Sequence, residues 1–268
     1  MKAKPIQAEL RVKRKQWITP HYIRIYLTGQ DIERFANTTT GVNNKILIPP
    51  EGVDKVYFPT FNYEKGEWEH PSEEIRPIVR TYTHRGINLE TKEIWIDFVA
   101  HGEEGPASAW ANRAKEGNIL GVLMRDGKTE LFPLRDNYLL VGDATGIPVL
   151  AAILEQVAPK VKVTCILEVH GKEDEQVLES KADVELIWLH NARPEKGSLL
   201  AAAVQKLNLP EKRRFAYVAA EYATVKAIRN YLRIDQHWQR EELYAYSYWK
   251  SGVAEDQSAS DRRKEKEA

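Results

Sequence analysis

An arginine and a tyrosine two positions apart, Arg80 and Tyr82, have the spacing that most clearly suggests chemistry. They lie in an alternating segment that predicts a β-strand over Val79–Arg85, where residues two apart share one face. A guanidinium can grip a phosphate through two parallel hydrogen bonds, and a tyrosine ring can lie against a planar ring system. Thr83 faces the other way unless the strand twists, bulges or ends there. The pair therefore predicts a dinucleotide cofactor that carries a flat ring.

A second segment predicts an anion-binding helix start. A strand expected over Glu93–Ala100 runs through a glycine-rich loop into a helix expected over Ala107–Lys115. Pro106 suits the first helical position, and the N–H groups after it lie at the positive end of the helix dipole. The candidate contacts at this helix start are Gly105, Pro106, Ala107 and Ser108. Together with Arg80, this helix start predicts a clamp for a pyrophosphate.

A third segment, Gly142–Pro148, follows a predicted strand over Tyr138–Val141 and opens a predicted helix over Ile147–Val157. In a parallel α/β sheet this is the position at which nucleotide phosphates bind. The segment is not the Gly-x-Gly-x-x-Gly fingerprint, so the prediction depends on its position in the fold. The candidate nucleotide contacts are Asp143, Ala144 and Thr145, of which the first and last also suit ordinary helix caps.

The elements that must position these residues differ between the two halves of the chain. Further strands in the first half are expected at Glu9–Trp17, His21–Thr28, Lys45–Ile48, Asn118–Met124 and Thr129–Phe132. Many short strands with one helix predict an antiparallel Greek-key barrel. Val53–Pro77 has no clear periodicity and is expected to be a loop or insertion beside the barrel.

In the second half, predicted strands and helices alternate. The strands are expected at Val161–Val169, Val184–Leu189, Phe215–Ala220 and Glu241–Trp249, and the helices at Ser198–Lys206 and Tyr222–Ile234. This alternation predicts a parallel sheet with crossover helices, hence a Rossmann-like domain. We therefore expect a barrel domain over residues 1–134, an α/β domain over 135–254, and a disordered polar tail over 255–268.

Composition narrows the function further. Lys and Arg together number 39, as do Asp and Glu, so the formal net charge is zero and nucleic acid is a poor partner. Cys165 is the single cysteine, which excludes an intramolecular disulfide, and the seven histidines lack a metal-binding spacing. The charged N-terminus has no apolar signal core, and the apolar runs are shorter than the roughly 20 residues that a bilayer requires. The expectation is a cytoplasmic monomer without a metal site or membrane insertion.

The first two segments together resemble a known family. Arg80-x-Tyr82-Thr83-x-Arg85, followed by the run from Asp97 to Ala111, is similar to the flavin-binding region of siderophore-interacting proteins, which are ferredoxin-reductase-like flavoproteins. The resemblance covers most of the chain and is tightest over residues 80–121 and 142–148. It implies FAD on the barrel, with the arginine on phosphate, the tyrosine and threonine near the flavin, His101 and Gly102 along the flavin or its ribityl chain, and residues 105–108 on the pyrophosphate.

The same resemblance implies NAD(P)H at the strand ends of the second domain, where Gly146 departs from the alanine common in the family. It also implies a ferric siderophore as substrate. Tyr246–Gly252 is similar to the family's terminal aromatic-Trp-basic-x-Gly motif, and Lys45, Arg125 and Lys250 are the candidate cations for an anionic chelate. The implied activity is ferric-siderophore reduction. A flavoprotein that exchanges electrons with a ferredoxin-type partner and a non-redox ferric-chelate-binding protein remain as alternatives. The siderophore class and the choice between NADH and NADPH stay open.

Overall fold

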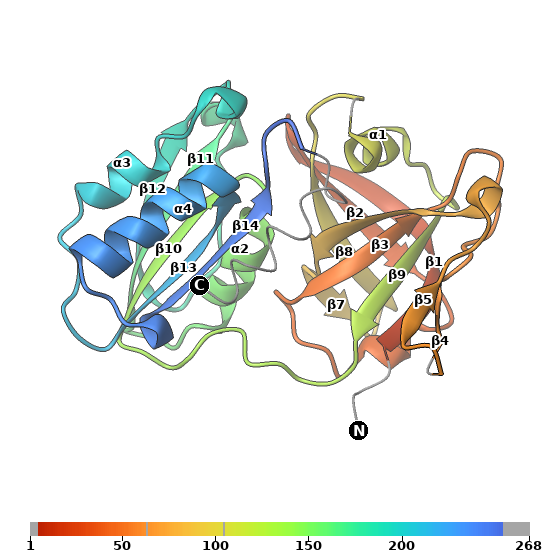
Figure 1. Cartoon of the computed structure of the whole chain (residues 1–268), viewed down its shortest axis with the longest axis horizontal. Coiled ribbons are helices and arrows are strands. Elements are labelled where there is room, and N and C mark those ends of the chain that lie inside the picture. The colour runs from red at the N-terminus through yellow and green to blue at the C-terminus, as the bar shows by residue number, and fades with distance from the viewer. Residues whose placement is uncertain (1–4, 63, 104, 254–268) are drawn as a thin grey trace. The chain divides into compact units, whose positions relative to one another are not determined.

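The computed structural model describes residues 5–62, 64–103 and 105–253. The chain divides into two compact units, residues 1–130 and 131–268, which are described separately (Figure 1). The polar tail expected over residues 255–268 lies outside the described residues. Within the described residues, no helix is long and apolar enough to cross a membrane.

Unit 1 is a curled, mainly antiparallel sheet that forms a half-barrel. Its seven strands lie in the order β6-β3-β9-β1-β2-β8-β7. They are β1 (Pro5–Thr19), β2 (Tyr22–Thr28), β3 (Asn43–Ile48), β6 (Ile78–Thr83), β7 (Gly86–Asn88), β8 (Glu93–Val99) and β9 (Ile119–Arg125). One helix, α1 (Pro106–Arg113), follows β8. The antiparallel fold expected for the first half is thus confirmed.

Alternating side chains explain why these segments form a half-barrel. On β2, Ile23, Ile25 and Leu27 are fully buried in the core, whereas Arg24 and Tyr26 between them are partly exposed. Successive side chains of a strand point to opposite faces, so this alternation gives the sheet one apolar face. The same core receives Phe98 of β8, which becomes important for the site.

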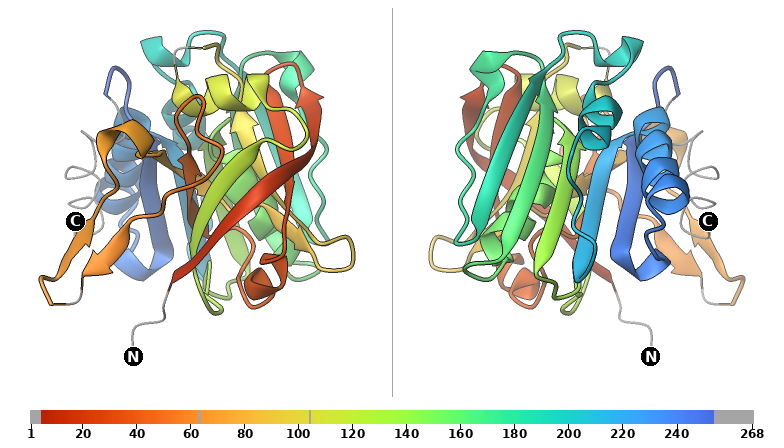
Figure 2. Two further views of the ribbon diagram at one scale, coloured as in Figure 1. Left: turned by 90° about the vertical axis from the view of Figure 1, so that its right-hand side faces the viewer. Right: turned by 90° about the vertical axis from the view of Figure 1, so that its left-hand side faces the viewer.

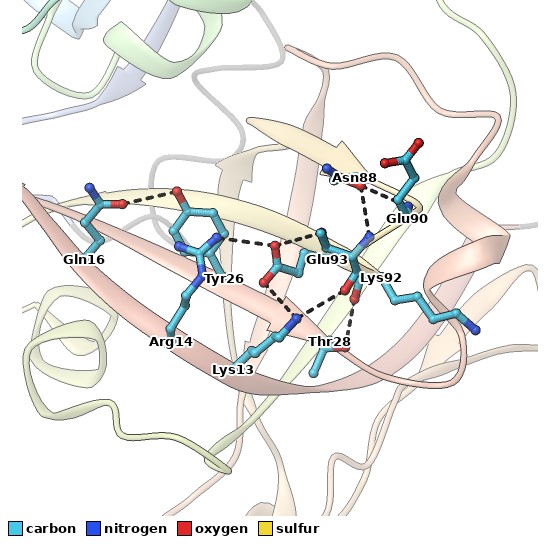
Figure 3. Close-up of polar contacts among 10 residues, drawn as sticks. Lys13, Arg14, Gln16, Tyr26, Thr28, Asn88, Glu90, Lys92 and Glu93 are labelled. Atoms are coloured by element: carbon cyan, nitrogen blue, oxygen red, sulfur yellow. Dashed lines mark hydrogen bonds and ion pairs between the residues drawn. The ribbon is translucent and has the colours of Figure 1, made fainter.

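On the polar side of this sheet, Glu93 at the start of β8 joins three strands (Figure 3). Its carboxylate pairs with Lys13 Nζ at 3.1 Å and Arg14 Nη2 at 3.3 Å, both on β1. The guanidinium of Arg14 also lies 3.1 Å from the ring centroid of Tyr26 on β2. Burial alone would raise the pKa of Glu93, but the hydrogen bonds from Lys13, Thr91 and Arg14 hold it below its ordinary value. These contacts stabilise the sheet on the side away from its core.

The segment Val53–Pro77, expected to be an irregular loop, contains a small hairpin. Strands β4 (Thr60–Asn62) and β5 (Glu67–Glu69) pair as a separate two-stranded sheet that projects from the half-barrel (Figure 2, left). The prediction of a strand over Thr129–Phe132 is wrong, because no strand of the structure includes these residues. The Thr129 amide instead donates a hydrogen bond to the Thr39 hydroxyl at 2.9 Å. The short β7 was also missed.

Unit 2 is a parallel sheet with helices on both faces. Its strand order is β12-β11-β10-β13-β14, and every pair is parallel. The strands are β10 (Asn137–Asp143), β11 (Lys162–Val169), β12 (Asp183–His190), β13 (Arg214–Glu221) and β14 (Leu243–Trp249). The helices are α2 (Ile147–Gln156), α3 (Leu200–Gln205) and α4 (Tyr222–Asn230). Figures 1 and 2 show α3 and α4 on one face and α2 on the other. The predicted Rossmann-like arrangement is confirmed.

Burial patterns fit this layered arrangement. The central strand β10 is buried along almost its whole length, as expected for a strand covered on both faces. Cys165 on β11 is fully buried, and burial raises the pKa of its thiol to about 12, so it is inert packing. All five strands run the same way, so their carboxyl ends meet at one edge of the sheet, called here the carboxyl edge.

Candidate functional site

The first two predicted segments meet in unit 1 through a row of aromatic rings. Tyr82 on β6 packs on Phe98 of β8, with ring centroids 4.5 Å apart, and Phe98 lies 5.7 Å from Trp110 of α1. The strand that carries Arg80 and the helix that follows the glycine-rich loop are thereby fixed against the same core residue. Tyr82 and Arg80 are both partly exposed, so the tyrosine ring and the guanidinium remain accessible to a ligand.

The register of β6 decides which predicted residues share a face. β6 and β3 pair without a bulge, so Arg80 and Tyr82 lie on one face and Thr81 and Thr83 on the other. Thr83 is buried and is the last residue of β6, the strand end at which it could turn toward the same ligand.

Two predicted substrate cations also lie on the Thr81 face. Lys45 is directly opposite Thr81 on β3 and donates a hydrogen bond to its hydroxyl. Lys45 is also opposite Leu123 on β9, so Arg125, two residues further on, shares its face. The structure therefore places Lys45 and Arg125 on one face, and Arg80 and Tyr82 on the other.

The loop between β8 and α1 is held in shape by Ser108. Its hydroxyl accepts a hydrogen bond from the His101 amide at 3.0 Å and donates one to the Gly102 carbonyl at 2.8 Å. Gly102 has φ of +90°, a conformation that glycine adopts most easily. A Cβ added to Gly105 would lie 2.5 Å from Cε1 of the His101 ring, so a side chain at this position would displace that ring. The Ser108 side chain thus shapes the loop from within.

The start of α1 fits an anionic group. Gly105 caps the helix without a side-chain hydrogen bond, Pro106 follows it, and the first turn has no acidic residue. The first helical hydrogen bond is donated by the Ala109 amide to the Gly105 carbonyl, so the amides of Ala107 and Ser108 precede the helical ladder. No carboxylate of the first turn offsets the positive end of this helix dipole. The residues present therefore suit the pyrophosphate of a dinucleotide cofactor.

Sequence reasoning missed a buried ion cluster beside this site. Asp97 on β8 accepts two hydrogen bonds from Arg24 on β2, at 2.7 and 2.8 Å, and Arg85 Nε lies 3.8 Å from the same carboxylate. Burial, then the charge of Asp97, raises the pKa of the nearby Tyr22 phenol well above its ordinary value. Arg24 is the cross-strand partner of Asp97, which could be recognised only once the pairing of β2 with β8 was known.

In unit 2, Asp143 is the last residue of β10, and both of its carboxylate oxygens accept hydrogen bonds from other residues of the protein. One carboxylate oxygen accepts from the Thr145 amide at 2.9 Å and its hydroxyl at 2.5 Å, and the other accepts from the Glu221 amide at 2.9 Å and from Trp249 Nε1 at 2.8 Å. Burial raises the pKa of Asp143, although these hydrogen bonds oppose the shift. Ala144 and Thr145 are partly exposed. Asp143 therefore organises the carboxyl edge of the sheet.

Two further carboxylates lie at the same edge. Glu168 on β11 is the register partner of Asp143 and accepts from the Leu199 amide at 2.6 Å. Burial raises the pKa of Glu168 too, and the charge of Asp143 adds to the shift. Glu221 on β13 caps α4 by accepting from the amides of its first turn. The neighbouring strands β11, β10 and β13 thus each have an acid at or next to the last residue, and these acids accept hydrogen bonds from N–H groups of the chain itself.

Lys250, the third predicted substrate cation, follows β14. Its Nζ lies 4.9 Å from the ring centroid of Tyr222, the first residue of α4. The Ser251 amide after it donates to Glu221 Oε1 at 3.3 Å. Lys250 is therefore held at the carboxyl edge of unit 2.

Known proteins share this architecture. A ferredoxin NADP+ reductase from Neisseria gonorrhoeae with bound FAD and NADP has the same fold, with a TM-score of 0.59 at 15% identity over 90% of this chain and 98% of that one. The siderophore-interacting protein SipS from Aeromonas hydrophila superimposes with a TM-score of 0.82 at 29% identity, covering 99% of both chains. The fold is thus that of the ferredoxin-reductase-like flavoproteins.

Sequence comparison gives the family. Residues 11–129 match the model of the siderophore-interacting FAD-binding domain, and residues 135–252 match that of the siderophore-interacting protein. The ferric vibriobactin reductase ViuB of Vibrio cholerae is 31% identical over 245 residues, which are 91% of this chain and 89% of that protein. The chain belongs to the siderophore-interacting protein family, and FAD is its cofactor.

Proposed function

We propose that this protein is a ferric-siderophore reductase that takes electrons from NAD(P)H and releases iron(II) from a ferric chelate. The observation that carries the proposal is the similarity to a ferric vibriobactin reductase over nearly the whole length of both chains. Both family domains also occur in the expected order.

In unit 1, the candidate site residues bind and orient FAD. Arg80 and the amides of Ala107 and Ser108 hold the pyrophosphate, and the ring of Tyr82 orients the flavin, with Thr83 at the strand end beside it. The loop fixed by Ser108 supplies His101 and Gly102 along the same ligand. FAD, when bound, supplies the exchange between a two-electron hydride donor and one-electron acceptors. Each NAD(P)H therefore reduces two ferric ions, and the chain need supply no acid or base for electron transfer.

The remaining residues act on the donor and the substrate. Ala144 and Thr145 lie at the carboxyl edge of unit 2, where dinucleotides bind in sheets of this kind. Lys45, Arg125 and Lys250 raise the local concentration of an anionic ferric chelate by electrostatic attraction. Iron(II) is held more weakly than iron(III) by hard oxygen ligands, so reduction releases it.

An anaerobic experiment tests this function. Purified protein with FAD is mixed with NADH or NADPH, and then with ferric chelates of different charge in the presence of a ferrous-iron chelator. We expect loss of the flavin absorbance with at least one nicotinamide, followed by formation of the ferrous complex. If a reduced ferredoxin bleaches the flavin and neither nicotinamide does, the electron donor is a ferredoxin and not NAD(P)H. If no donor yields the ferrous complex, the reductase function is refuted.

A further inference from the structure

Lys250 is surrounded by a set of contacts that all lie within unit 2. We call this set the C-terminal clasp, formed by Asp143, Glu221, Tyr222, Trp249 and Ser251. Trp249 before the lysine donates its indole N–H to Asp143, and Ser251 after it donates its amide to Glu221. The lysine ammonium itself lies over the ring of Tyr222. Both neighbours of Lys250 in the chain and its own side chain are thus held at the carboxyl edge.

A bulge in β14 makes the clasp possible. β14 pairs in parallel with β13, with Ser247 opposite Ala220, but the next pair is Trp249 opposite Glu221. The extra residue, Tyr248, shifts the side-chain direction at the end of the strand, as β-bulges do. Trp249 then lies where its indole reaches Asp143. A tight turn follows, in which the Val253 amide donates to the Lys250 carbonyl at 3.1 Å.

The acids of the clasp each hold more than one element. Asp143 joins the end of β10, the start of α4 through the Glu221 amide, and β14 through Trp249. Glu221 caps α4 with one oxygen and holds the Ser251 amide with the other. Because both carboxylates also order their own strand ends, the segment around the lysine is attached to the ends of β10 and β13.

We propose that the C-terminal clasp holds the Lys250 ammonium as a preorganised cation for an anionic ferric chelate, and that Asp143 and Trp249 are positioning residues that act through it. The inference rests on the proposed function, in which Lys250 attracts the substrate. It gives Asp143, which the sequence assigned to the nucleotide, a role toward the chelate as well.

The physical reason lies in the entropy of a lysine side chain. An unrestrained lysine loses much rotamer freedom when it binds an anion, and this loss weakens the complex. A cation already placed over an aromatic ring, on a backbone held on both sides, loses less on binding. The ring leaves the charge intact, so the ammonium still attracts an anion. If the clasp is loosened, the affinity for the chelate should therefore fall by no more than the amount that Lys250 contributes to it.

A double-mutant cycle tests this coupling. Trp249→Phe removes the indole N–H and keeps an aromatic ring, and Lys250→Gln removes the cation. Affinities of the FAD-loaded full chain are measured by titration calorimetry for the anionic tris-catecholate complex of iron(III) with 2,3-dihydroxybenzoate. The cationic hydroxamate complex ferrioxamine B serves as the charge comparison. Trp17→Phe, at a half-exposed tryptophan of β1, is the matched control.

For the anionic chelate we expect Trp249→Phe to raise Kd about three- to tenfold, in line with the cost of ordering one long side chain on binding. Lys250→Gln should raise it at least as much. In the Lys250→Gln background, Trp249→Phe should add less than about twofold, because the two act as one unit. Neither change should weaken binding of the cationic chelate, and Trp17→Phe should leave both affinities as they are.

An undiminished effect of Trp249→Phe in the Lys250→Gln background, or equal losses for both chelates, would overturn the inference. So would wild-type affinity in Lys250→Gln while ferric reduction continues, which leaves the proposed function standing. Absence of any ferric reduction by the wild-type protein would instead remove the proposed function. If Trp249→Phe folds poorly, Tyr222→Leu removes the ring beneath the lysine, leaves the bonds of Asp143 intact, and gives the same cycle.

Discussion

Ser108 and His101 are joined by a hydrogen bond of 3.0 Å from the His101 amide to the serine hydroxyl, which is almost completely buried. This bond and the one to the Gly102 carbonyl close the loop between β8 and α1 from the inside. The loop geometry that presents the amides of α1 therefore depends on one hydroxyl group.

Replacing Ser108 with alanine should destabilise the protein by about 1–3 kcal/mol, because the two hydrogen bonds of its buried hydroxyl are lost, each worth roughly 0.5–1.5 kcal/mol. The same change should release FAD more readily, since the loop shapes its site. Urea unfolding and the fluorescence of released FAD measure the two effects. Ser72→Ala is the control, because Ser72 is exposed and makes no capping hydrogen bond with its side chain. Equal behaviour of the two variants would contradict the role given to Ser108.

Arg80→Gln should raise the Kd for FAD about 10- to 100-fold, the range expected for charged hydrogen bonds to phosphate. Arg80→Lys should recover part of the loss, because lysine keeps the charge and lacks the planar fork of donors. Titration of the apoprotein with FAD measures both. The exposed Arg76, which donates to the Pro71 carbonyl at 3.1 Å, provides the control Arg76→Gln. Wild-type affinity in Arg80→Gln would remove the arginine from the cofactor site.

His84 should make stability fall in mild acid. It is fully buried directly after β6, and burial, then the charge of Lys128, lowers its pKa from 6.5 to about 4. The unfolded chain binds this proton below pH 6.5 and the folded chain only near pH 4, so stability is lost as the pH falls between these values, by at most about 3 kcal/mol.

His84→Gln should remove this loss, so the difference in unfolding free energy between variant and wild type should shift in favour of the variant as the pH falls from 6.5 to 4. Urea unfolding across that range gives the slope. The exposed His70, substituted in the same way, should keep the wild-type slope. If the His84→Gln variant also keeps the wild-type slope of unfolding free energy against pH, His84 is not the cause of the loss of stability in acid.

Gly146→Ala should destabilise unit 2 by about 1–3 kcal/mol. A Cβ at this position would lie 2.3 Å from the Ala219 carbonyl oxygen, which belongs to the backbone of β13 and cannot move alone. At Gly142 the nearest obstacle, at 2.8 Å, is a methyl of the Leu150 side chain, which can adjust more easily. Gly142→Ala should therefore lose less, as read from the midpoint of urea unfolding at unchanged m-value. A larger loss in Gly142→Ala would contradict this reading of the packing.

The close approach at Gly146 also explains a departure seen in the sequence. The family resemblance implies alanine after the threonine, but here the Ala219 carbonyl lies where that methyl would be. The fold itself could be predicted because apolar alternation marks the half-barrel strands and a continuous apolar run marks β10. The β4–β5 hairpin could not, since its strands have three residues each and no buried face.

Sequence spacing could select candidate cofactor residues because Arg80 and Tyr82 share a strand and the residues from His101 to Ser108 share a loop, and their role toward FAD stays a prediction. It could not separate the face of Lys45 from that of Arg80, which depends on the pairing of β3 with β6. Nor could it join Asp143 to Trp249, which are 106 positions apart and meet through a bulge. Contacts set by distant pairing are therefore the part that required the structure.

The distance along the chain between Asp143 and Trp249 also has a consequence for synthesis. All seven strands of the half-barrel have been translated by Arg125, so the first unit can fold while the ribosome is still making the second. The carboxylate of Asp143, by contrast, receives its indole donor only when β14 has been made. A nascent chain halted before Leu243 would have this acid without its partner, and would be a better substrate for proteases than the finished protein.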